Sequence, residues 1–370
     1  MNGNELAMRK EGVGMTVFYS VLHFFVDGVC ALAMFGRFLP GEKGRFYILI
    51  YNFCAFALQM PMGVLLDAWS ERCGRRRECA FLTAAAGVLC TLAGAVLHPA
   101  VLGIGNALFH VGGGVGTIHE DGGRMWKGRG LGVFVAPGAL GLYFGTLAGK
   151  SGVWRSGLGI AGVCMALFGA GAAYCAYLQR RMGRSGGAGN GLESLPDSVP
   201  TGTFRLWPVT VCLAVVILRS YMGMAVDFSW KSGVPAGALA VLALAAGKTA
   251  GGFAAARYGL RGTAVISLGA AAVCYLFPAS MPLGLGALFL FNMTMPMTLY
   301  FLVCHMSRMP GFAFGILTFG LFLGFLPGYF GLLPEAGGSL TGCVGSLVSL
   351  VLLVWMVRKE NEGECLWEFI

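Results

Sequence analysis

Residues 63–77 read GVLLDAWSERCGRRR and join two long apolar runs. Asp67 stands where the first run ends, and four arginines, at positions 72 and 75–77, precede the second run, which begins at Cys79. A short cationic turn between two apolar segments of membrane-crossing length is typical of a cytoplasmic loop, because positive charge is retained on the cytoplasmic side. This stretch therefore predicts a multi-pass membrane protein.

The composition agrees with that prediction. The chain has 370 residues, of which 56% are hydrophobic and 12% charged, with a mean hydropathy of +0.73. Soluble proteins carry about twice that charged fraction. Twelve spans of about 20 residues would fill about 240 residues, which leaves no room for a separate soluble catalytic module. We therefore expect an all-α membrane protein in the lipid bilayer, and not an enzyme.

Charge and cysteine usage exclude two other classes. The net charge of +9 is explained by Lys and Arg in cytoplasmic loops beside anionic lipid headgroups, so we predict no nucleic-acid partner. The 12 cysteines form no Cys-x-x-Cys pair, and most lie in apolar runs, where Cys behaves as a small hydrophobe. We therefore predict no disulfide framework, no metal site and no cofactor.

The apolar runs fall into two sets of six. Residues 1–178 are predicted to form a first six-helix bundle, 179–204 a polar cytoplasmic linker, and 205–370 a second six-helix bundle with a short cytoplasmic tail. The twelve predicted spans cover about 13–36, 46–66, 79–98, 100–119, 130–149, 154–178, 206–226, 234–255, 263–280, 283–304, 311–333 and 338–357.

The distribution of positive charge predicts the topology. If both termini are cytoplasmic, 18 of the 26 Lys and Arg residues are cytoplasmic and six lie on the other side. Two sets of six spans are typical of parallel repeats related by an axis along the membrane normal. Gly252, Arg257 and Arg261 echo the 63–77 loop in the second half, with Ala256 in the place of Asp67.

The 63–77 loop resembles the signature between the second and third helices of the major facilitator superfamily. The matching residues are Gly63 and Asp67 at its front and Arg72, Gly74, Arg75 and Arg76 at its back. The family places the glycine three residues after the aspartate, whereas Gly74 follows Asp67 by seven. The resemblance implies two pseudo-symmetric halves that rock about a midplane site, with these residues latching a cytoplasmic gate. It also implies a monomer in the bacterial inner (plasma) membrane.

Within that superfamily, the first half resembles the fosmidomycin-resistance branch of efflux proteins. Three stretches carry the resemblance: His23-Phe-Phe-Val-Asp27 in span one, Gly105-Asn-Ala-Leu-Phe-His110 in span four, and Val133-Phe134 with Gly138-Ala-Leu-Gly141 and Gly145 in span five. In the second half, Leu218-Arg219-Ser220 of span seven is similar to an Arg-Ser of that branch. The chain departs from the branch at Val111-Gly112, where the branch has Pro and Glu, and at Gly145-Thr146, where it has Gly-Pro. The resemblance implies efflux, but the branch's substrate does not transfer with it.

Asp27 is the first candidate for function. It lies near the middle of span one, where a carboxylate costs at least about 2.5–3.5 kcal/mol unless it is paired or hydrated. His23 is four residues earlier and so on the same helix face. We predict that Asp27 and His23 exchange a proton with a central cavity. The alternative is a structural hydrogen bond that locks span one to a neighbouring helix.

Three basic residues are candidate substrate contacts. Arg219 in span seven is always charged and reads carboxylate or phosphonate in a bidentate manner. It can instead pair with Asp27, or extend towards the outer headgroups. Lys248 lies about two turns from a cytoplasmic end, so it can line the cavity or extend to the interface. His110 beside Phe109 is either a site residue or a packing histidine.

The glycine stripe Gly141, Gly145 and Gly149 in span five is typical of close helix packing. In a transporter it would let helices rock, although static packing explains it equally. Pro296 and Pro327 predict helix bends.

The predicted function is secondary active transport, specifically proton-coupled export of a small anionic or amphipathic compound. One alternative is uptake of a metabolite such as a nucleoside, sugar or organic acid. A more distant one is a membrane-embedded enzyme or lipid-handling protein. That class needs polar groups converging at one membrane face, and the sequence shows no nucleophile–base or metal-ligand spacing.

Overall fold

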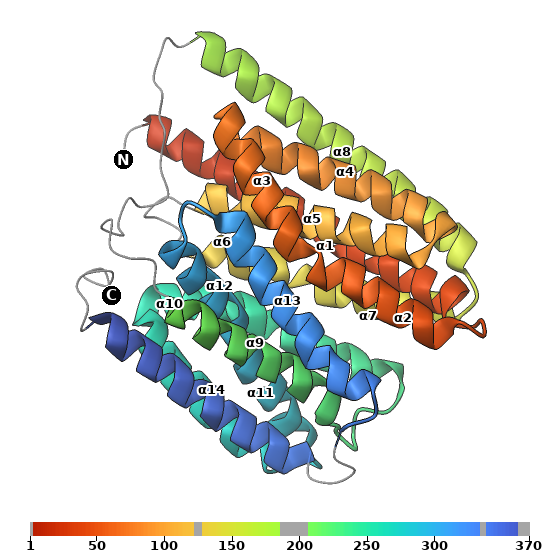
Figure 1. The fold of residues 1–370 in the computed structure, drawn as a ribbon, viewed down its shortest axis with the longest axis vertical. Helices are drawn as coiled ribbons and strands as arrows, with labels where there is room; N and C mark the ends of the chain where they lie inside the picture. The colour runs from red at the N-terminus through yellow and green to blue at the C-terminus, as the bar shows by residue number, and fades with distance from the viewer. Residues whose placement is uncertain (1–2, 122–127, 186–205, 334–337, 362–370) are drawn as a thin grey trace.

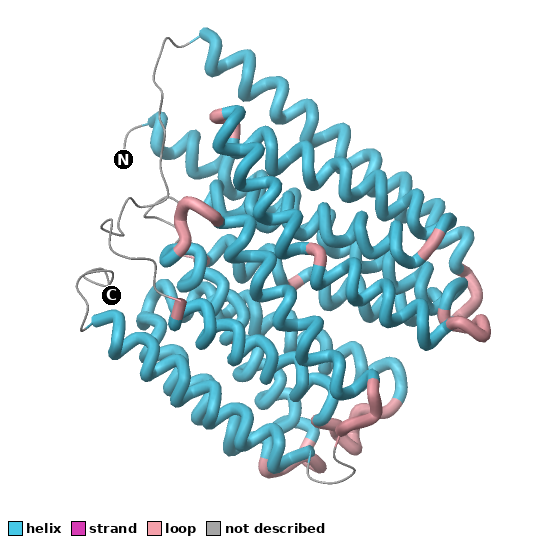
Figure 2. The backbone as a smooth tube through the Cα atoms, viewed as in Figure 1, coloured by secondary structure: helices cyan, strands magenta, loops and turns pink. Residues whose placement is uncertain are grey.

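The computed structural model describes residues 3–121, 128–185, 206–333 and 338–361. This part of the chain consists of helices and connecting loops and contains no strand (Figure 2). Figure 1 shows the helices of the first half together in the upper part of the molecule and those of the second half in the lower part.

The first half contains several helices interrupted by π-helical or irregular turns. Its elements are α1 (Gly3–Ala33), η1 (Met34–Phe38), α2 (Gly44–Asn52), η2 (Phe53–Ala57), α3 (Gln59–Cys73), α4 (Arg76–Leu97), α5 (Pro99–Asp121), α6 (Arg129–Val135), α7 (Pro137–Lys150) and α8 (Trp154–Ser185). Predicted span one corresponds to α1 with η1, span two to α2, η2 and α3, and span five to α6 with α7.

The second half follows the same plan. Its elements are α9 (Trp207–Ala225), α10 (Gly233–Tyr275), α11 (Met281–Asn292), α12 (Thr294–His305), α13 (Pro310–Tyr329) and α14 (Gly338–Asn361). Predicted span ten is divided into α11 and α12 at Met293, three residues before Pro296. A proline lacks the N–H that would bond to the carbonyl four residues earlier, so the helix is interrupted there. Pro327, in contrast, lies inside the continuous α13.

The long helix α10 contains two predicted spans. Its 43 residues would measure about 64 Å if straight, roughly twice the thickness of a bilayer core. It is interrupted at Gly259, whose φ of 78° and ψ of 160° are readily adopted only by glycine. α10 is therefore two helices joined at Gly259.

Ten helical segments in the described part are long and apolar enough to cross a membrane. α10 counts once among them although it contains two helices, and α8, which is 32 residues long, is not among them. The start of α1 and the end of α14 lie on the same side of the bundle (Figure 1), as an even number of crossings requires. The total of twelve spans and the cytoplasmic side of the termini stay predictions.

The outer surface is apolar, as a lipid-facing surface must be. Leu65, Leu89, Ile160, Ile266 and Val351 each expose 66–69% of their surface. Exposed apolar area on this scale is unusual for a soluble monomer. The surface and the helix lengths together describe a multi-pass membrane protein.

Two boundaries differ from the sequence prediction. α1 begins at Gly3, upstream of the predicted start of span one near residue 13. The linker expected at 179–204 begins as helix, because α8 continues to Ser185. Residues 186–204 and the tail after Asn361 lie outside the described residues.

Several pairs of helices join the two halves. Among them, α13 of the second half lies against α3, and α10 lies against α6 and α7. Between α13 and α3, a side chain at Gly63 would collide with the backbone of Gly311. Between α7 and α10, the Tyr143 hydroxyl donates to the Val234 carbonyl over 2.6 Å. Asp67 of α3 and Lys248 of α10, two of the predicted functional residues, lie on helices that form these contacts.

Candidate functional site

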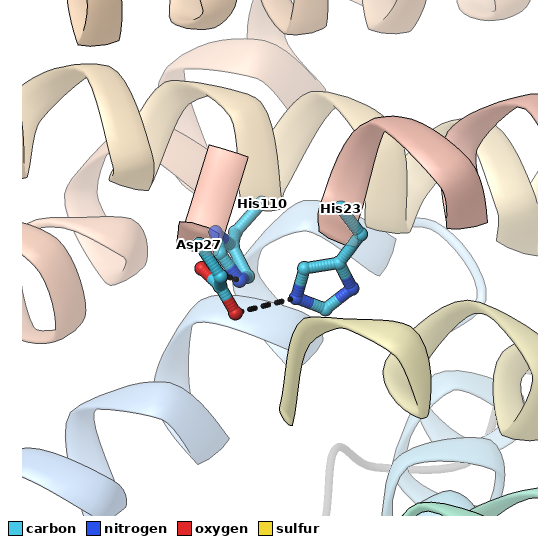
Figure 3. Close-up of side chains that lie close together, drawn as sticks. All are labelled: His23, Asp27 and His110. Carbon is cyan, nitrogen blue, oxygen red and sulfur yellow. Dashed lines mark ion pairs between the residues drawn. The ribbon is translucent and has the colours of Figure 1, made fainter. Parts of the chain in front are cut away.

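The structure gathers His23 and Asp27 of α1 with His110 of α5 (Figure 3). His23 Nε2 lies 3.2 Å from Asp27 Oδ2, and His110 Nε2 lies 3.6 Å from Asp27 Oδ1. Asn106, one helical turn before His110, donates from Nδ2 to Asp27 Oδ1 over 3.0 Å. We call His23, Asp27 and His110 the His–Asp–His cluster.

Backbone carbonyls fix the orientation of both imidazole rings. His23 Nδ1 lies 2.7 Å from the Phe134 carbonyl oxygen, and His110 Nδ1 lies 2.9 Å from that of Asn106. A carbonyl can only accept a hydrogen bond, so both Nδ1 atoms carry hydrogen. In a neutral ring the remaining nitrogen, Nε2, then carries a lone pair and no hydrogen. Both Nε2 atoms face the Asp27 carboxylate.

This arrangement requires a cation. Two lone pairs and a carboxylate repel one another unless protons or a metal ion lie between them. Both imidazoles are buried, whereas the Asp27 side chain stays 19% exposed. The rings of Phe134 and His110 lie 4.8 and 4.5 Å from the His23 ring, between centroids. The cluster therefore lies in low-dielectric surroundings.

The same three residues offer ligand atoms for a metal ion. One atom from each lies within 4.8 Å of the others. The sequence predicts no metal site, because it shows no metal-ligand spacing. Here the ligands come from α1 and α5, and such a site leaves no local pattern.

Gly138, in the first turn of α7, borders the cluster. A methyl group at this position would collide with His23 Nε2 and Asp27 Oδ2. The glycine thus leaves open the space between the imidazole and the carboxylate.

Arg219 on α9 is buried, with only 9% of its surface exposed, so it does not extend to the headgroups. Its Nη1 has no hydrogen-bond partner among the described residues. The ion pairs of Asp27 are with the two histidines, and Arg219 forms none with it. A buried, incompletely bonded guanidinium is costly, which favours a partner that the chain does not supply.

Lys248 on α10 reaches across to the first half. Its Nζ donates to the Val135 carbonyl over 3.3 Å, at the break between α6 and α7. It is near enough to Arg219 and Asp27 for their charges to interact. Lys248 therefore joins α10 of the second half to the first half of the molecule.

The 63–77 loop contacts the second half through Asp67. Its Oδ1 and Oδ2 accept hydrogen bonds of 2.8 Å from the backbone N–H groups of Gly311 and Phe312. These groups lie in the first turn of α13, where N–H groups lack helical partners and the helix dipole favours negative charge.

The arginines of the loop behave differently from Asp67. Arg72 and Arg76 are exposed, and Arg75 pairs with Glu78 in the next helix at 3.5 Å. Gly74 ends α3 with a φ of 63°.

Comparison with known proteins identifies the fold. No protein-family model and no curated protein matches the sequence. The human organic anion transporter MFSD10 (TETRAN) has a similar structure, with a TM-score of 0.58 and 16% identity over 93% of this chain and 98% of that one. A variant of the E. coli fucose:proton symporter FucP gives a TM-score of 0.54 and 12% identity, with the same coverage of both chains. This chain has the major facilitator fold. The resemblance to the fosmidomycin-resistance branch stays a prediction.

In this fold, the glycine stripe of α7 lies against span one. A side chain at Gly141 would collide with the backbone of Phe24, and one at Gly145 with that of Gly28. Gly149 lies close to Leu32 and Gly36 in the same way. The close packing of α1 and α7 brings Gly138 beside the His–Asp–His cluster.

Four contributors to the site were not predicted from the sequence: Asn106, Gly138 and the carbonyls of Phe134 and Val135. The spacing of Asn106 could have predicted its place in the site, since it precedes His110 by four residues and so lies on the same helix face. For Gly138 and the carbonyls of Phe134 and Val135, the only sequence signal was the neighbouring Pro137. A proline lacks an N–H, and the helix is interrupted there. That break leaves both carbonyls to accept hydrogen bonds from His23 and Lys248.

Proposed function

We propose that this protein is a secondary active transporter that exports a small anionic or amphipathic compound in exchange for protons. The observation that carries the proposal is the buried, incompletely bonded guanidinium of Arg219, with Lys248 nearby. Charged residues inside a membrane domain are costly and mark substrate or ion pathways. An anionic group on the substrate would supply the hydrogen-bond acceptors that Arg219 lacks.

The His–Asp–His cluster is the proposed proton site. Its carboxylate faces two imidazole nitrogens whose ring N–H groups point away to backbone carbonyls. A proton arriving at the cluster is therefore shared among the three groups. The partly exposed carboxyl of Asp27 is the point at which protons would reach it.

The two halves would alternate access by rocking about the site. In this proposal Asp67 latches the cytoplasmic gate by holding the first turn of α13. Opening would separate Gly63 from Gly311 and break both Asp67 hydrogen bonds. The protein would act as a monomer in a bacterial inner membrane, without a cofactor or a catalytic residue.

Uptake of an organic acid is the second candidate. Arg219 would bind a carboxylate as readily as a phosphonate, so it does not set the direction of transport. The structurally similar proteins do not set it either, since one is named a fucose:proton symporter and the other an organic anion transporter. A counterflow assay combined with an imposed pH gradient separates export from uptake.

Proton flux in inside-out membrane vesicles tests the proposal. Vesicles containing the parent protein are energised, a panel of anionic compounds that includes fosmidomycin is added, and a dye reports the pH gradient. We expect at least one compound to discharge the gradient with the parent and with the exposed-arginine control Arg261→Gln, but not with Arg219→Gln. Equal discharge by parent and Arg219→Gln for every active compound would contradict the role of Arg219.

A further inference from the structure

We propose that His23, Asp27 and His110 form a binding site for a divalent transition-metal ion such as Zn²⁺, Mn²⁺ or Co²⁺. Two imidazole nitrogens and one carboxylate oxygen converge from α1 and α5. This donor set suits first-row transition metals, whereas Ca²⁺ and Mg²⁺ prefer oxygen ligands alone.

The separations fit ligands that surround one ion. Nitrogen and oxygen bonds to zinc of about 2.1 Å place neighbouring ligand atoms about 3.0–3.4 Å apart. The cluster shows 3.2 Å between His23 Nε2 and Asp27 Oδ2, and 3.6 Å between His110 Nε2 and Asp27 Oδ1. The second separation is too long for a hydrogen bond. A small inward movement of His110 would complete a coordination shell.

The surroundings of the ligands are those of metal-binding histidines. Such histidines donate their second ring N–H to a backbone carbonyl or a carboxylate, which fixes the lone pair towards the metal. His23 and His110 both do so, to Phe134 and Asn106. Asn106 in turn holds the carboxylate through Oδ1.

The cluster also has space and access for an ion. The missing side chain of Gly138 leaves room beside His23 Nε2 and Asp27 Oδ2. The exposed part of Asp27 gives a route to it. Three protein ligands leave at least one coordination position for water, whereas structural zinc sites are closed by four protein ligands.

This inference deepens the proposed function, because a metal ion would occupy the same lone pairs as the proton. Binding of the metal requires no transport, however, so the two can be tested separately. The thiol of Cys30 lies near the cluster, with its Sγ 3.5 Å from Asn106 Nδ2. The test must therefore distinguish a sulfur ligand from nitrogen and oxygen ligands.

Titration of the purified full-length protein with Co²⁺ tests the inference, using an affinity tag without histidines. We expect one Co²⁺ per chain with visible d–d absorption, no near-ultraviolet thiolate-to-cobalt charge-transfer band, and displacement by Zn²⁺. Asp27→Asn and His110→Gln should each weaken Co²⁺ binding at least about tenfold, as even second-shell changes commonly do. His98→Gln, which changes an exposed histidine outside the cluster, should bind as the parent does.

Gly138→Ala is a second variant, which separates loss of the metal site from misfolding. It keeps all three ligands but fills the space between them, and it should also weaken Co²⁺ binding at least about tenfold. Elution as a single monodisperse peak shows that each variant is folded. Absence of saturable Co²⁺ binding by the parent would overturn the inference, and so would binding that Asp27→Asn and Gly138→Ala leave unchanged.

The vesicle assay on the same preparations separates this result from the proposed function. Active vesicles without Co²⁺ binding would refute the metal site and leave the transporter standing. Specific Co²⁺ binding without any response to the anionic compounds would establish the metal site and refute anion transport.

Discussion

The two halves of the molecule bury charge in different ways. In the first half, Asp27 is surrounded by polar groups, since Asn106 donates a hydrogen bond to it and the ring nitrogens of His23 and His110 face its oxygens. In the second half, Arg219 is buried more deeply than Asp27, but its Nη1 has no partner among the described residues. The first site is pre-formed for a small cation, whereas the second lacks an anion.

The two sites are expected to contribute differently to the free energy of folding. A buried polar atom without a partner costs about 1–3 kcal/mol, and a charged one more. In the cluster a bound proton or metal ion would offset this cost, and at Arg219 a bound anion would do so. Burial of the Arg219 guanidinium destabilises the fold, so its presence is explained most simply by a role in binding an anion. This contrast predicts that substitutions in the two halves have effects of opposite sign on stability.

Asp27→Leu should show the largest effect. It removes the acceptor of Asn106 Nδ2 and leaves two imidazole nitrogens facing an apolar group. We expect a loss of about 2–4 kcal/mol in unfolding free energy together with complete loss of proton-coupled flux. Thermal unfolding and the vesicle assay measure the two effects. A stability equal to that of the parent would show that the cluster is not a bonded unit.

Arg219→Met should act in the opposite direction. It replaces an incompletely bonded cation by an apolar side chain of similar length, so we expect stabilisation by about 1–3 kcal/mol. Transport of anionic compounds should be abolished at the same time. Leu218→Met, on the same helix, is the control for the new side chain. Destabilisation by Arg219→Met alone would mean that the guanidinium has protein partners after all.

Asp67→Asn tests the contact between the halves. The neutral amide removes negative charge from the first turn of α13, which is worth about 0.3–1 kcal/mol and up to about 2 in partly buried sites. The structure predicts a slower transport rate with a small loss of stability, measured by initial rates at matched expression. Transport at the parent rate would eliminate the latch.

Arg75→Ala should have the smallest effect. Its ion pair with Glu78 is exposed, with 71% of the arginine side chain accessible, and exposed pairs contribute about 0–1 kcal/mol. We expect stability within about 0.5 kcal/mol of the parent. A large loss would show that the loop arginines carry the contact that we assign to Asp67.

Much of the fold was predictable because membrane helices leave strong local signals. The apolar runs and the cationic 63–77 loop located the helices, and the spacing of His23 and Asp27 placed them on one face. The break at Gly259 was not predicted, because a single glycine in an apolar run is ordinary in membrane helices.

The candidate site was only partly predictable, because its geometry depends on how helices cross. Nothing in the sequence near His110 shows that α5 brings it to Asp27. The role of Gly138 follows from the close packing of α7 on α1, and the carbonyl contacts of His23 and Lys248 follow from the break at Pro137. Such relations between distant segments are not encoded in local periodicity.

The most direct test of the division between the halves is counterflow in proteoliposomes, using an anionic compound active in the vesicle assay. Counterflow requires substrate binding and alternation of the halves but no net proton movement. The account predicts that Asp27→Asn keeps counterflow and loses proton-driven flux, whereas Arg219→Gln loses both. If Arg219→Gln retains counterflow, or if Asp27→Asn retains proton-driven flux, the assignment of an anion site to the second half and a cation site to the first is wrong.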